Sequence, residues 1–226
     1  MKLAPIVVLL AVAVAPSAAQ TVAVQPAPRI EVEAGGGLVG GAALGTGDAN
    51  LRASATARQP YRLFTADSRF ERAPTVHVRA AVPLGRRFAL EGGVTRGRPE
   101  IRTSLTADAE SAAPRTSVEQ VDQYVFDASL VWMVDALRLG DRLVPFVAGG
   151  GGYLRQLHEG RTVIEHGQAY HAGGGIKYRL LMRTTGFVRS AGLRGDARVL
   201  LVRGGISFED RPRPHAAISG GVFVGF

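Results

Sequence analysis

The segment 124–134 reads YVFDASLVWMV, and its pattern decides the class of fold. Its even positions carry large apolar residues or alanine, whereas its odd positions include the polar residues Asp127 and Ser129. Alternation with a period of two is typical of a β-strand with one apolar and one polar face, because successive side chains of a strand point to opposite sides. The segment is therefore predicted to be a strand rather than a helix.

The same alternation recurs along the chain and predicts seven further strands. Four of them alternate clearly, and they span residues 75–84, 88–96, 172–180 and 193–201. The other three are two glycine-rich segments that alternate less clearly and the end of the chain, at 30–38, 143–153 and 215–226. The chain is thus expected to form eight strands.

Two kinds of connection alternate between these strands. The long polar ones lie at 45–73, 97–116, 155–166 and 204–214, and the short ones lie at 84–87, 136–142 and 181–191. Long loops at one end and short turns at the other are typical of an antiparallel meander closed into a membrane barrel. We therefore predict an all-β fold, an eight-stranded antiparallel up-and-down transmembrane β-barrel. A soluble β-sandwich is the structural competitor, and ten strands are the alternative count if the first long loop holds a hairpin around 61–70.

Composition limits the classes of function. The chain has 226 residues, 29 glycines, no cysteine and a formal net charge of +8. The lack of cysteine excludes a disulfide framework, a thiol nucleophile and a cysteine-based metal site. Nearly all basic residues are arginine, and no cluster of aromatic and basic residues resembles an RNA-binding signature. We interpret the charge as arginine on parts that meet anionic lipid phosphates, and no nucleic-acid partner is expected.

The first residues predict export. Met1 and Lys2 form a basic start, residues 3–15 form an apolar run, and small residues precede a cleavage site after Ala19. The run is too short for a transmembrane helix, which needs about 20 apolar residues. We expect three parts, namely a signal peptide at 1–19, a short periplasmic segment at 20–28 and a barrel at 29–226.

The end of the chain carries the most specific motif. Ser219, Gly221, Val224 and Phe226 have the polar-x-glycine-x-x-apolar-x-aromatic spacing of a terminal strand that the outer-membrane insertion machinery recognises. Together with the signal peptide and the eight strands, this motif gives a chain that resembles the small outer-membrane barrels of the OmpA/OmpX type over about residues 30–226. OmpA-type proteins carry a peptidoglycan-binding domain after the barrel, and because nothing follows Phe226 here, the resemblance does not imply a wall-anchoring role.

The resemblance implies a location and partners. It implies a monomer in the outer membrane of a Gram-negative-type bacterium, inserted there by the barrel-assembly machinery. Outer-membrane lipid and lipopolysaccharide are its expected partners. The arginines of the first long loop are the residues expected to contact lipopolysaccharide, since guanidinium groups bind phosphates in bidentate fashion; they are Arg52, Arg58, Arg62, Arg69 and Arg72.

If the apolar faces meet lipid, the charged residues of the opposite faces line the lumen. The acidic ones are Glu31, Glu33, Glu91, Asp127 and Asp196, and the basic ones are Arg79, Lys177, Arg179, Arg194 and Arg198. All of them are expected in the periplasmic half of the barrel. Because a buried ion is costly unless it is paired, such a balanced set predicts an ionic network that plugs the lumen. A conducting ring would instead show charges of one sign.

The other half of the lumen is predicted to be lined by glycines, namely Gly35, Gly37, Gly93, Gly173 and Gly175. Two interpretations stay open for them. They relieve crowding in tightly curved strands, or they leave a small water-filled vestibule that opens to the outside.

No catalytic, cofactor or metal site is predicted. The five histidines are interpreted as loop or strand-end residues, and none shows a two-histidine helix spacing. Ser129 is expected to face inward, but with no histidine on the flanking strands, so the serine–histidine pair of a lipid hydrolase is not expected. We predict a structural or surface-interaction role with a plugged lumen. A narrow channel or small-solute-binding barrel is the alternative, and a lipid-modifying enzyme is the third interpretation.

Overall fold

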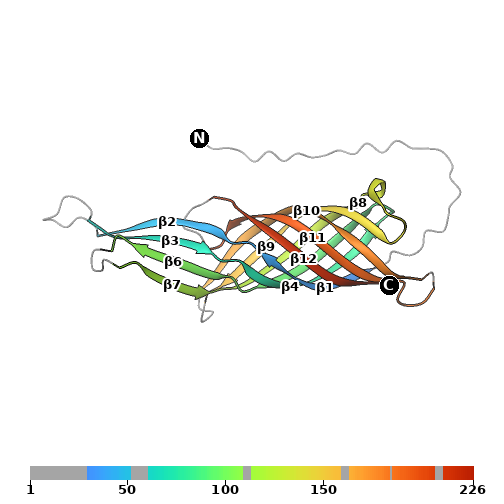
Figure 1. Cartoon of the computed structure of the whole chain (residues 1–226), viewed down its shortest axis with the longest axis horizontal. Coiled ribbons are helices and arrows are strands. Elements are labelled where there is room, and N and C mark those ends of the chain that lie inside the picture. Colours follow the sequence, from blue (N-terminus) through green and yellow to red (C-terminus); the bar gives the residue numbers. More distant parts are fainter. Residues whose placement is uncertain (1–29, 52–60, 109–112, 159–162, 184, 207–210) are drawn as a thin grey trace.

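The computed structural model describes residues 30–51, 61–108, 113–158, 163–183, 185–206 and 211–226 (Figure 1). The predicted signal peptide, its cleavage after Ala19 and the segment 20–28 lie outside the described residues. Two of the loop arginines, Arg52 and Arg58, also lie outside them.

Within the described residues, eight antiparallel strands close into a barrel. β1 completes the ring, because it pairs with β4 on one side and with the last strand, β12, on the other. The barrel strands are β1 (Glu31–Val39), β4 (Ala73–Leu84), β5 (Phe88–Gly97), β8 (Asp122–Met133), β9 (Leu143–Leu157), β10 (Ile164–Met182), β11 (Ser190–Gly204) and β12 (Arg213–Gly225). Each contains or largely overlaps one predicted strand, so the eight-stranded barrel is confirmed, and the sandwich and the ten-stranded barrel are wrong.

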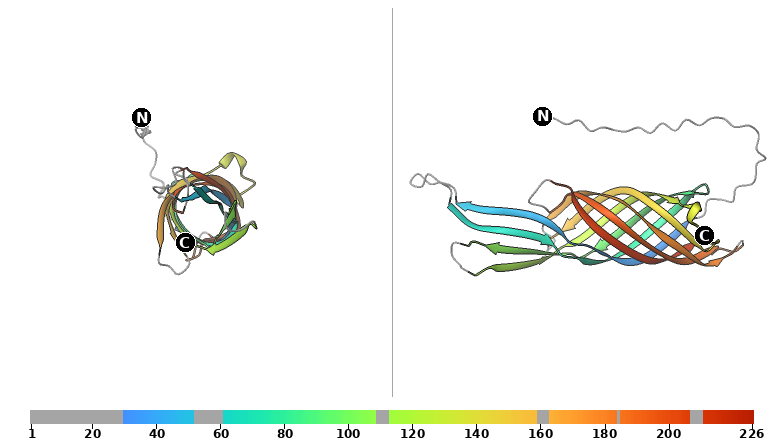
Figure 2. Two further views of the ribbon diagram at one scale, coloured as in Figure 1. Left: turned by 90° about the vertical axis from the view of Figure 1, so that its left-hand side faces the viewer. Right: turned by 45° about the horizontal axis from the view of Figure 1, so that its top comes forward.

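Two of the predicted long loops are mostly strand. Residues in 45–73 and 97–116 form β2 (Ala42–Leu51), β3 (Tyr61–Phe70), β6 (Glu100–Thr106) and β7 (Arg115–Gln120), which make a separate sheet in the order β2-β3-β6-β7. Figures 1 and 2 show this sheet extending beyond one end of the barrel as a continuation of β1, β4, β5 and β8. The hairpin suspected around 61–70 therefore exists, but it lengthens the wall outward and adds no strand to the barrel.

The extension is attached to the barrel by a small apolar core. Leu44, Phe70, Ile101 and Val121 are buried together where the two sheets meet. Farther out, polar side chains hold neighbouring strands, as where the Thr65 hydroxyl donates to Asp48 across 2.7 Å. A sheet without hydrocarbon on either face does not need strict apolar alternation, and its sequence was for that reason interpreted as loop.

The two ends of the barrel differ. One end, which we call the turn end, carries the short connections 85–87, 134–142 and 183–189, of which the second contains the 3₁₀ helix η1 (Asp135–Leu137), and the C-terminus lies there (Figures 1 and 2). The opposite end, which we call the hairpin end, carries the β2-β3-β6-β7 sheet. The predicted long connections are long between β1 and β4 and between β5 and β8. The other two, at 158–163 and 205–212, are no longer than the turn-end connection 134–142, because β9, β10 and β11 extend farther than predicted.

The apolar faces of the strands point outward. Val78, Leu90 and Leu130 are each at least half exposed, at 55%, 52% and 50%, while their sequence neighbours Arg79, Glu91 and Ser129 are buried. Aromatic residues lie toward both ends of this surface: Phe88 stacks on Trp132 near the turn end, and Phe126 contacts Tyr153 nearer the hairpin end, each with ring centroids 6.5 Å apart. An apolar band between two aromatic girdles is the exterior of a transmembrane barrel. None of the helices formed by the described residues has the length and apolar character to cross a membrane.

A matched pair of substitutions tests what covers this surface. Val78 on the barrel and Val118 on β7 are similarly exposed, at 55% and 50%. We expect Val78→Arg to lower the free energy of unfolding by about 2–4 kcal/mol, as for a charge near the middle of a bilayer. Val118→Arg lies in water and is expected to change it by less than about 0.5 kcal/mol. Urea unfolding in thin lipid vesicles measures both, and equal effects of the two substitutions would contradict a lipid-covered barrel.

Candidate functional site

The barrel interior holds a buried network of ion pairs centred on Arg194. The Arg194 guanidinium donates through Nη1 to Glu33 Oε2 across 2.9 Å and contacts both carboxylate oxygens of Glu91. The side chains of Arg194, Glu33 and Glu91 are only 1–2% exposed. The aromatic ring of Phe146 covers the guanidinium, whose carbon lies 4.4 Å from the ring centroid. Strands β1, β5 and β11 are thereby joined across the lumen.

Two further arginines extend this network through Asp196. Arg198 Nε donates to Asp196 Oδ1 and Arg79 Nη1 donates to Asp196 Oδ2, each across 2.9 Å. The Ser219 hydroxyl accepts from Arg79 across 3.2 Å and donates to Asp196 across 3.0 Å. Arg198 also reaches Glu91 across 3.2 Å, which links this group back to Arg194. Ser219, which the sequence suggested only as part of a terminal motif, is thus also a lumen residue.

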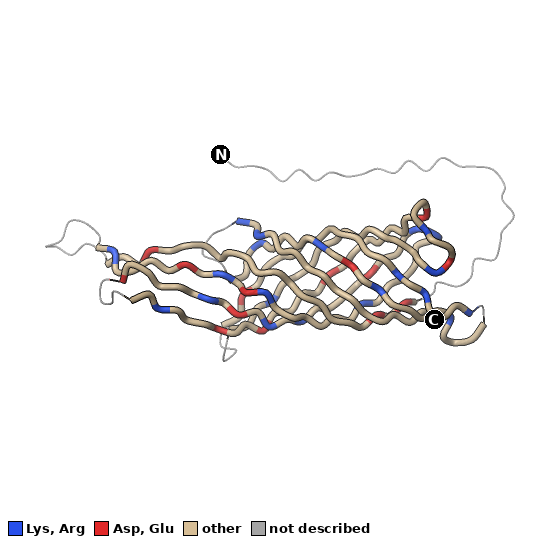
Figure 3. Tube along the Cα trace, in the orientation of Figure 1, with Lys and Arg blue, Asp and Glu red and all other residues tan. Residues whose placement is uncertain are grey.

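A separate pair lies closer to the turn end. The Lys177 ammonium contacts the Glu31 carboxylate and lies 5.6 Å from the centroid of the Phe223 ring. Arg179 lies two residues farther along β10, where its Nη1 donates to the carbonyl of Asp141 across 3.5 Å. Figure 3 shows charged residues along the half of the barrel wall toward the C-terminus and also around the hairpin end.

Two histidines join the network, and their interpretation as loop or strand-end residues was wrong. His77 Nε2 lies 3.1 Å from Glu33 Oε1, and both side chains are nearly inaccessible. His171 Nε2 lies 2.8 Å from the Ser129 hydroxyl and 3.3 Å from Arg198 Nη1. His77 occupies a polar-face position in its strand, which was a usable signal. His171 was missed because β10 begins at Ile164, well before the predicted start at 172.

The Ser129–His171 contact corrects a second expectation. No histidine lies on the flanking strands of β8, but His171 reaches Ser129 across the whole width of β9. The residue in register with both is Gly150, and a Cβ there would lie 2.0 Å from the Ala128 carbonyl oxygen. Only glycine allows β8 and β9 to approach so closely at this point, and its missing side chain leaves the space through which serine and histidine meet.

The geometry of this pair differs from that of a catalytic triad. Arginine can only donate, so the contact with Arg198 makes His171 Nε2 an acceptor. Asp127 approaches the same nitrogen, with Oδ2 at 3.8 Å. A triad needs the carboxylate on the other ring nitrogen, where it orients a base that accepts the serine proton. The pair is therefore part of the lumen network rather than an activated nucleophile.

Formal charges in the connected network are close to balance. Its described members are four carboxylates, three guanidinium groups and two imidazoles, namely Glu33, Glu91, Asp127, Asp196, Arg79, Arg194, Arg198, His77 and His171. Four negative and three positive charges leave one negative charge when both imidazoles are neutral. His77 and His171 are members of this network that the count of five acidic and five basic side chains omitted.

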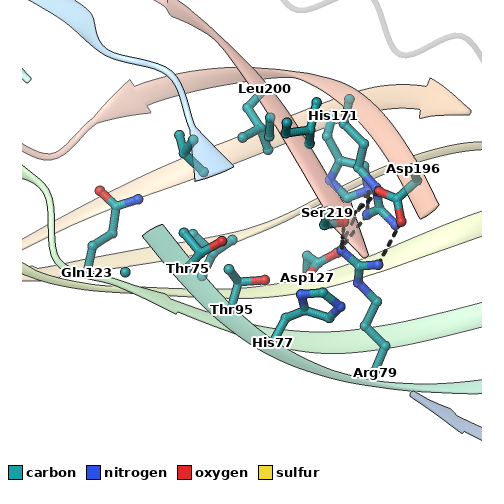
Figure 4. A pocket seen from close by; sticks show the side chains of 16 residues that line it. Thr75, His77, Arg79, Thr95, Gln123, Asp127, His171, Asp196, Leu200 and Ser219 are labelled. Atoms are coloured by element: carbon teal, nitrogen blue, oxygen red, sulfur yellow. Dashed lines mark hydrogen bonds and ion pairs between the residues drawn. The ribbon is translucent and has the colours of Figure 1, made fainter. Parts of the chain in front are cut away.

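A cavity of about 70 Å³ lies on the hairpin side of this network (Figure 4). Its floor includes Asp127, His171 and Asp196, and Thr75 and Leu200 contribute to its wall. The five glycines predicted to line a vestibule are not among its lining residues. At Gly173 an added Cβ would lie 2.2 Å from the Ala197 carbonyl oxygen, so this glycine permits close strand packing and leaves no open space.

The loop arginines that the structure describes lie on or near β3. Arg62, Arg69 and Arg72 are exposed at the hairpin end. Arg69 pairs with Glu71 across 2.9 Å, and Glu71 also accepts from Arg102 of β6 across 3.1 Å.

The residues of the terminal motif lie on β12 or directly after it, where the Phe226 amide donates to the Ile30 carbonyl. In the described part of the chain, no group of three or more histidine or acidic side chains is arranged to hold a metal ion.

Substitution of Arg194 tests the central pairings. Arg194→Met leaves Glu33 and Glu91 with fewer partners in a buried site, and we expect it to cost about 3–5 kcal/mol of unfolding free energy. Adding Glu91→Gln should recover part of this loss. The control is Arg87→Met, which breaks an exposed pair with Asp135 and should cost no more than about 1 kcal/mol. Equal costs for Arg194→Met and Arg87→Met in urea unfolding would contradict the energetic importance of the network.

Comparison with known proteins gives a likeness of fold. No family model matches the sequence, and no curated protein matches it either. Among solved structures, Neisserial surface protein A (NspA) superimposes with a TM-score of 0.53 at 13% identity, over 87% of this chain and 97% of that one. The outer membrane protein OprG from Pseudomonas aeruginosa gives 0.49 at 9% identity, over 88% and 96%. The outer membrane protease OmpT from Escherichia coli gives 0.40 at 9% identity, over 92% and 99%.

Of these three likenesses, the one to NspA has a TM-score above 0.5 and bears on the fold. It agrees with the closed eight-stranded ring and with the apolar exterior described above. The chain therefore has the fold of the small outer-membrane β-barrels.

Proposed function

We propose that this protein is a closed-lumen scaffold of the bacterial outer membrane, with a structural or surface-interaction role and no catalytic step. The observation that carries the proposal is the buried network around Arg194, which connects opposite walls of the barrel. Ions of both signs pair there at the same depth, whereas a conducting pore is lined by charges of one sign around open water. An eight-stranded barrel is also just wide enough for side chains to fill.

The orientation follows from the connections. Short turns of outer-membrane barrels face the periplasm, and long connections face the outside. The turn end is therefore assigned to the periplasm and the β2-β3-β6-β7 sheet to the cell surface. The proposal includes a monomeric protein that is exported by its signal peptide, which is cleaved after Ala19. The terminal residues Ser219, Gly221, Val224 and Phe226 serve as its assembly signal.

Planar-bilayer recording tests the closed lumen. We expect the folded protein to give no steady single-channel steps under conditions in which a porin does. A charge-neutral variant that removes two carboxylates and two guanidinium groups, with alanine at Glu33, Glu91, Arg194 and Arg198, should allow ions to pass. Retained heat-modifiable migration on a gel shows that this variant is folded. Steady steps from the unaltered protein would contradict the proposal.

A narrow channel or small-solute site is the second candidate, and the cavity of about 70 Å³ favours it. Its floor offers carboxylate, guanidinium and imidazole groups, and its volume suits a few water molecules or a very small polar solute. The same recording separates a narrow channel from the closed scaffold, because a channel would conduct without any substitution.

The surface-interaction role includes contact with lipopolysaccharide through arginines of the first hairpin. Arg62 and Arg72 are exposed there, and Arg69 is shared with Glu71. Guanidinium groups bind phosphates in bidentate fashion, and each basic residue near an anionic membrane surface contributes about 1 kcal/mol.

Glutamine at Arg52, Arg58, Arg62, Arg69 and Arg72 tests this contact. We expect the affinity of the barrel for lipopolysaccharide micelles to fall by about fivefold or more, since about 1 kcal/mol is lost for each engaged arginine. The control variant carries Arg86→Gln and Arg87→Gln at the turn end. Unchanged binding of the five-site variant would reject the contact.

A further inference from the structure

A second basic site lies on the outer wall of the barrel, on the strand ends nearest the hairpin end. Arg155 of β9 and Arg203 of β11 both point outward and are exposed. Each lies one or two residues before the end of its strand, at Leu157 and Gly204. They lie at the boundary of the apolar band, next to Tyr153 of the aromatic girdle nearer the hairpin end.

The register brings these arginines to one place. Arg155 is directly opposite His166 of β10, and Arg203 is directly opposite Gln168 of the same strand. Neighbouring strands are about 4.8 Å apart, so the backbones of β9 and β11 are separated by about 10 Å. Two arginine side chains can span that separation, and both guanidinium groups can therefore reach one headgroup placed over β10.

Aromatic and imidazole groups fill the space between them. His166 stacks on the Tyr153 ring with centroids 5.6 Å apart, and its Nδ1 shares a hydrogen bond with the Tyr153 hydroxyl. Tyr170 lies two residues after Gln168 on β10, on the same face of the strand, and its hydroxyl donates to the Gln168 side-chain oxygen across 2.9 Å. The result is a fixed aromatic platform flanked by two cations at the depth where lipid headgroups lie.

Charge pairing distinguishes these two arginines from Arg96 and Arg98 on the same rim. Arg96 and Arg98 share the single carboxylate of Asp122, at 3.1 Å and 2.7 Å. Among the residues that the structure describes, no carboxylate lies within ion-pair distance of Arg155 or Arg203. Two exposed positive charges above an apolar wall are complementary to an anionic phosphate whose acyl chains lie along that wall.

We infer that Arg155, Arg203, His166 and Tyr153 form a site for the phosphate group of a membrane lipid in the outer leaflet. The acyl chains of this lipid would pack on the exposed apolar faces of β9, β10 and β11. The inference rests on the proposed membrane placement, but it is independent of the closed lumen and of the hairpin arginines. A lipid phosphomonoester is the best-suited headgroup, because it can carry two negative charges and accept from both guanidinium groups.

Lipid selectivity in vesicles tests the site. The barrel is reconstituted in phosphatidylcholine vesicles that contain spin-labelled phosphatidic acid or spin-labelled phosphatidylcholine, and the motionally restricted fraction gives the relative association constant. We expect a preference for phosphatidic acid that Arg155→Gln with Arg203→Gln lowers by about fivefold or more, because about 1 kcal/mol is lost for each arginine. The charge-matched control, Arg183→Gln with Arg189→Gln, removes two arginines at the turn end and should retain the preference.

Three further outcomes decide the inference. Excess inorganic phosphate should leave the preference intact if the ligand is a lipid, whereas full displacement by inorganic phosphate would assign the site to a free anion and overturn it. An equal loss of preference in both double variants would indicate a general charge effect and would also overturn it. Heat-modifiable migration confirms folding of each variant, and bilayer recording of the same samples keeps a failure here separate from a failure of the closed lumen.

Discussion

The Arg194 guanidinium lies between the carboxylates of Glu33 and Glu91, and the rest of the structure depends on that pairing. With lipid outside, the polar faces of the strands have nowhere to point except into the lumen. A guanidinium taken out of water must meet carboxylates at hydrogen-bond distance, or its desolvation is not compensated. Arg194 meets two that come from different strands, so its pairing also fixes β1 and β5 relative to β11.

Glycine makes room for this pairing. Several charged residues of the lumen lie opposite a glycine on the next strand: Arg79 is opposite Gly93, which is opposite Asp127, and Arg198 is opposite Gly173. A narrow ring could not hold long side chains on every strand at one level. Each arginine instead extends over a neighbour that has no side chain. These glycines thus make room for the long side chains of the network, and the cavity beyond it is lined by a different set of residues.

The sequence predicts those parts of the structure that the membrane constrains. Lipid on one face forces a period of two, so Val78 and Leu130 mark their strands and Glu33, Arg79 and Arg194 could be assigned to the lumen. Water covers the β2-β3-β6-β7 sheet, and its alternation is weak enough that its strands were interpreted as loops. The contact between Ser129 and His171 was missed for a different reason. It depends on two strands separated by a third, and on Gly150 between them, which no spacing along the chain reveals.

The lumen network draws on both ends of the polypeptide. Glu33 belongs to the first strand of the ring, whereas Ser219 and its partner Asp196 belong to the last two. A sheet made of β4 to β10 alone would hold Arg79 and Glu91 without the ion-pair partners described above, which lie on β1 and β11. Partly assembled intermediates are therefore electrostatically unfavourable in hydrocarbon, and closure of the ring and neutralisation of its interior have to occur as one cooperative event.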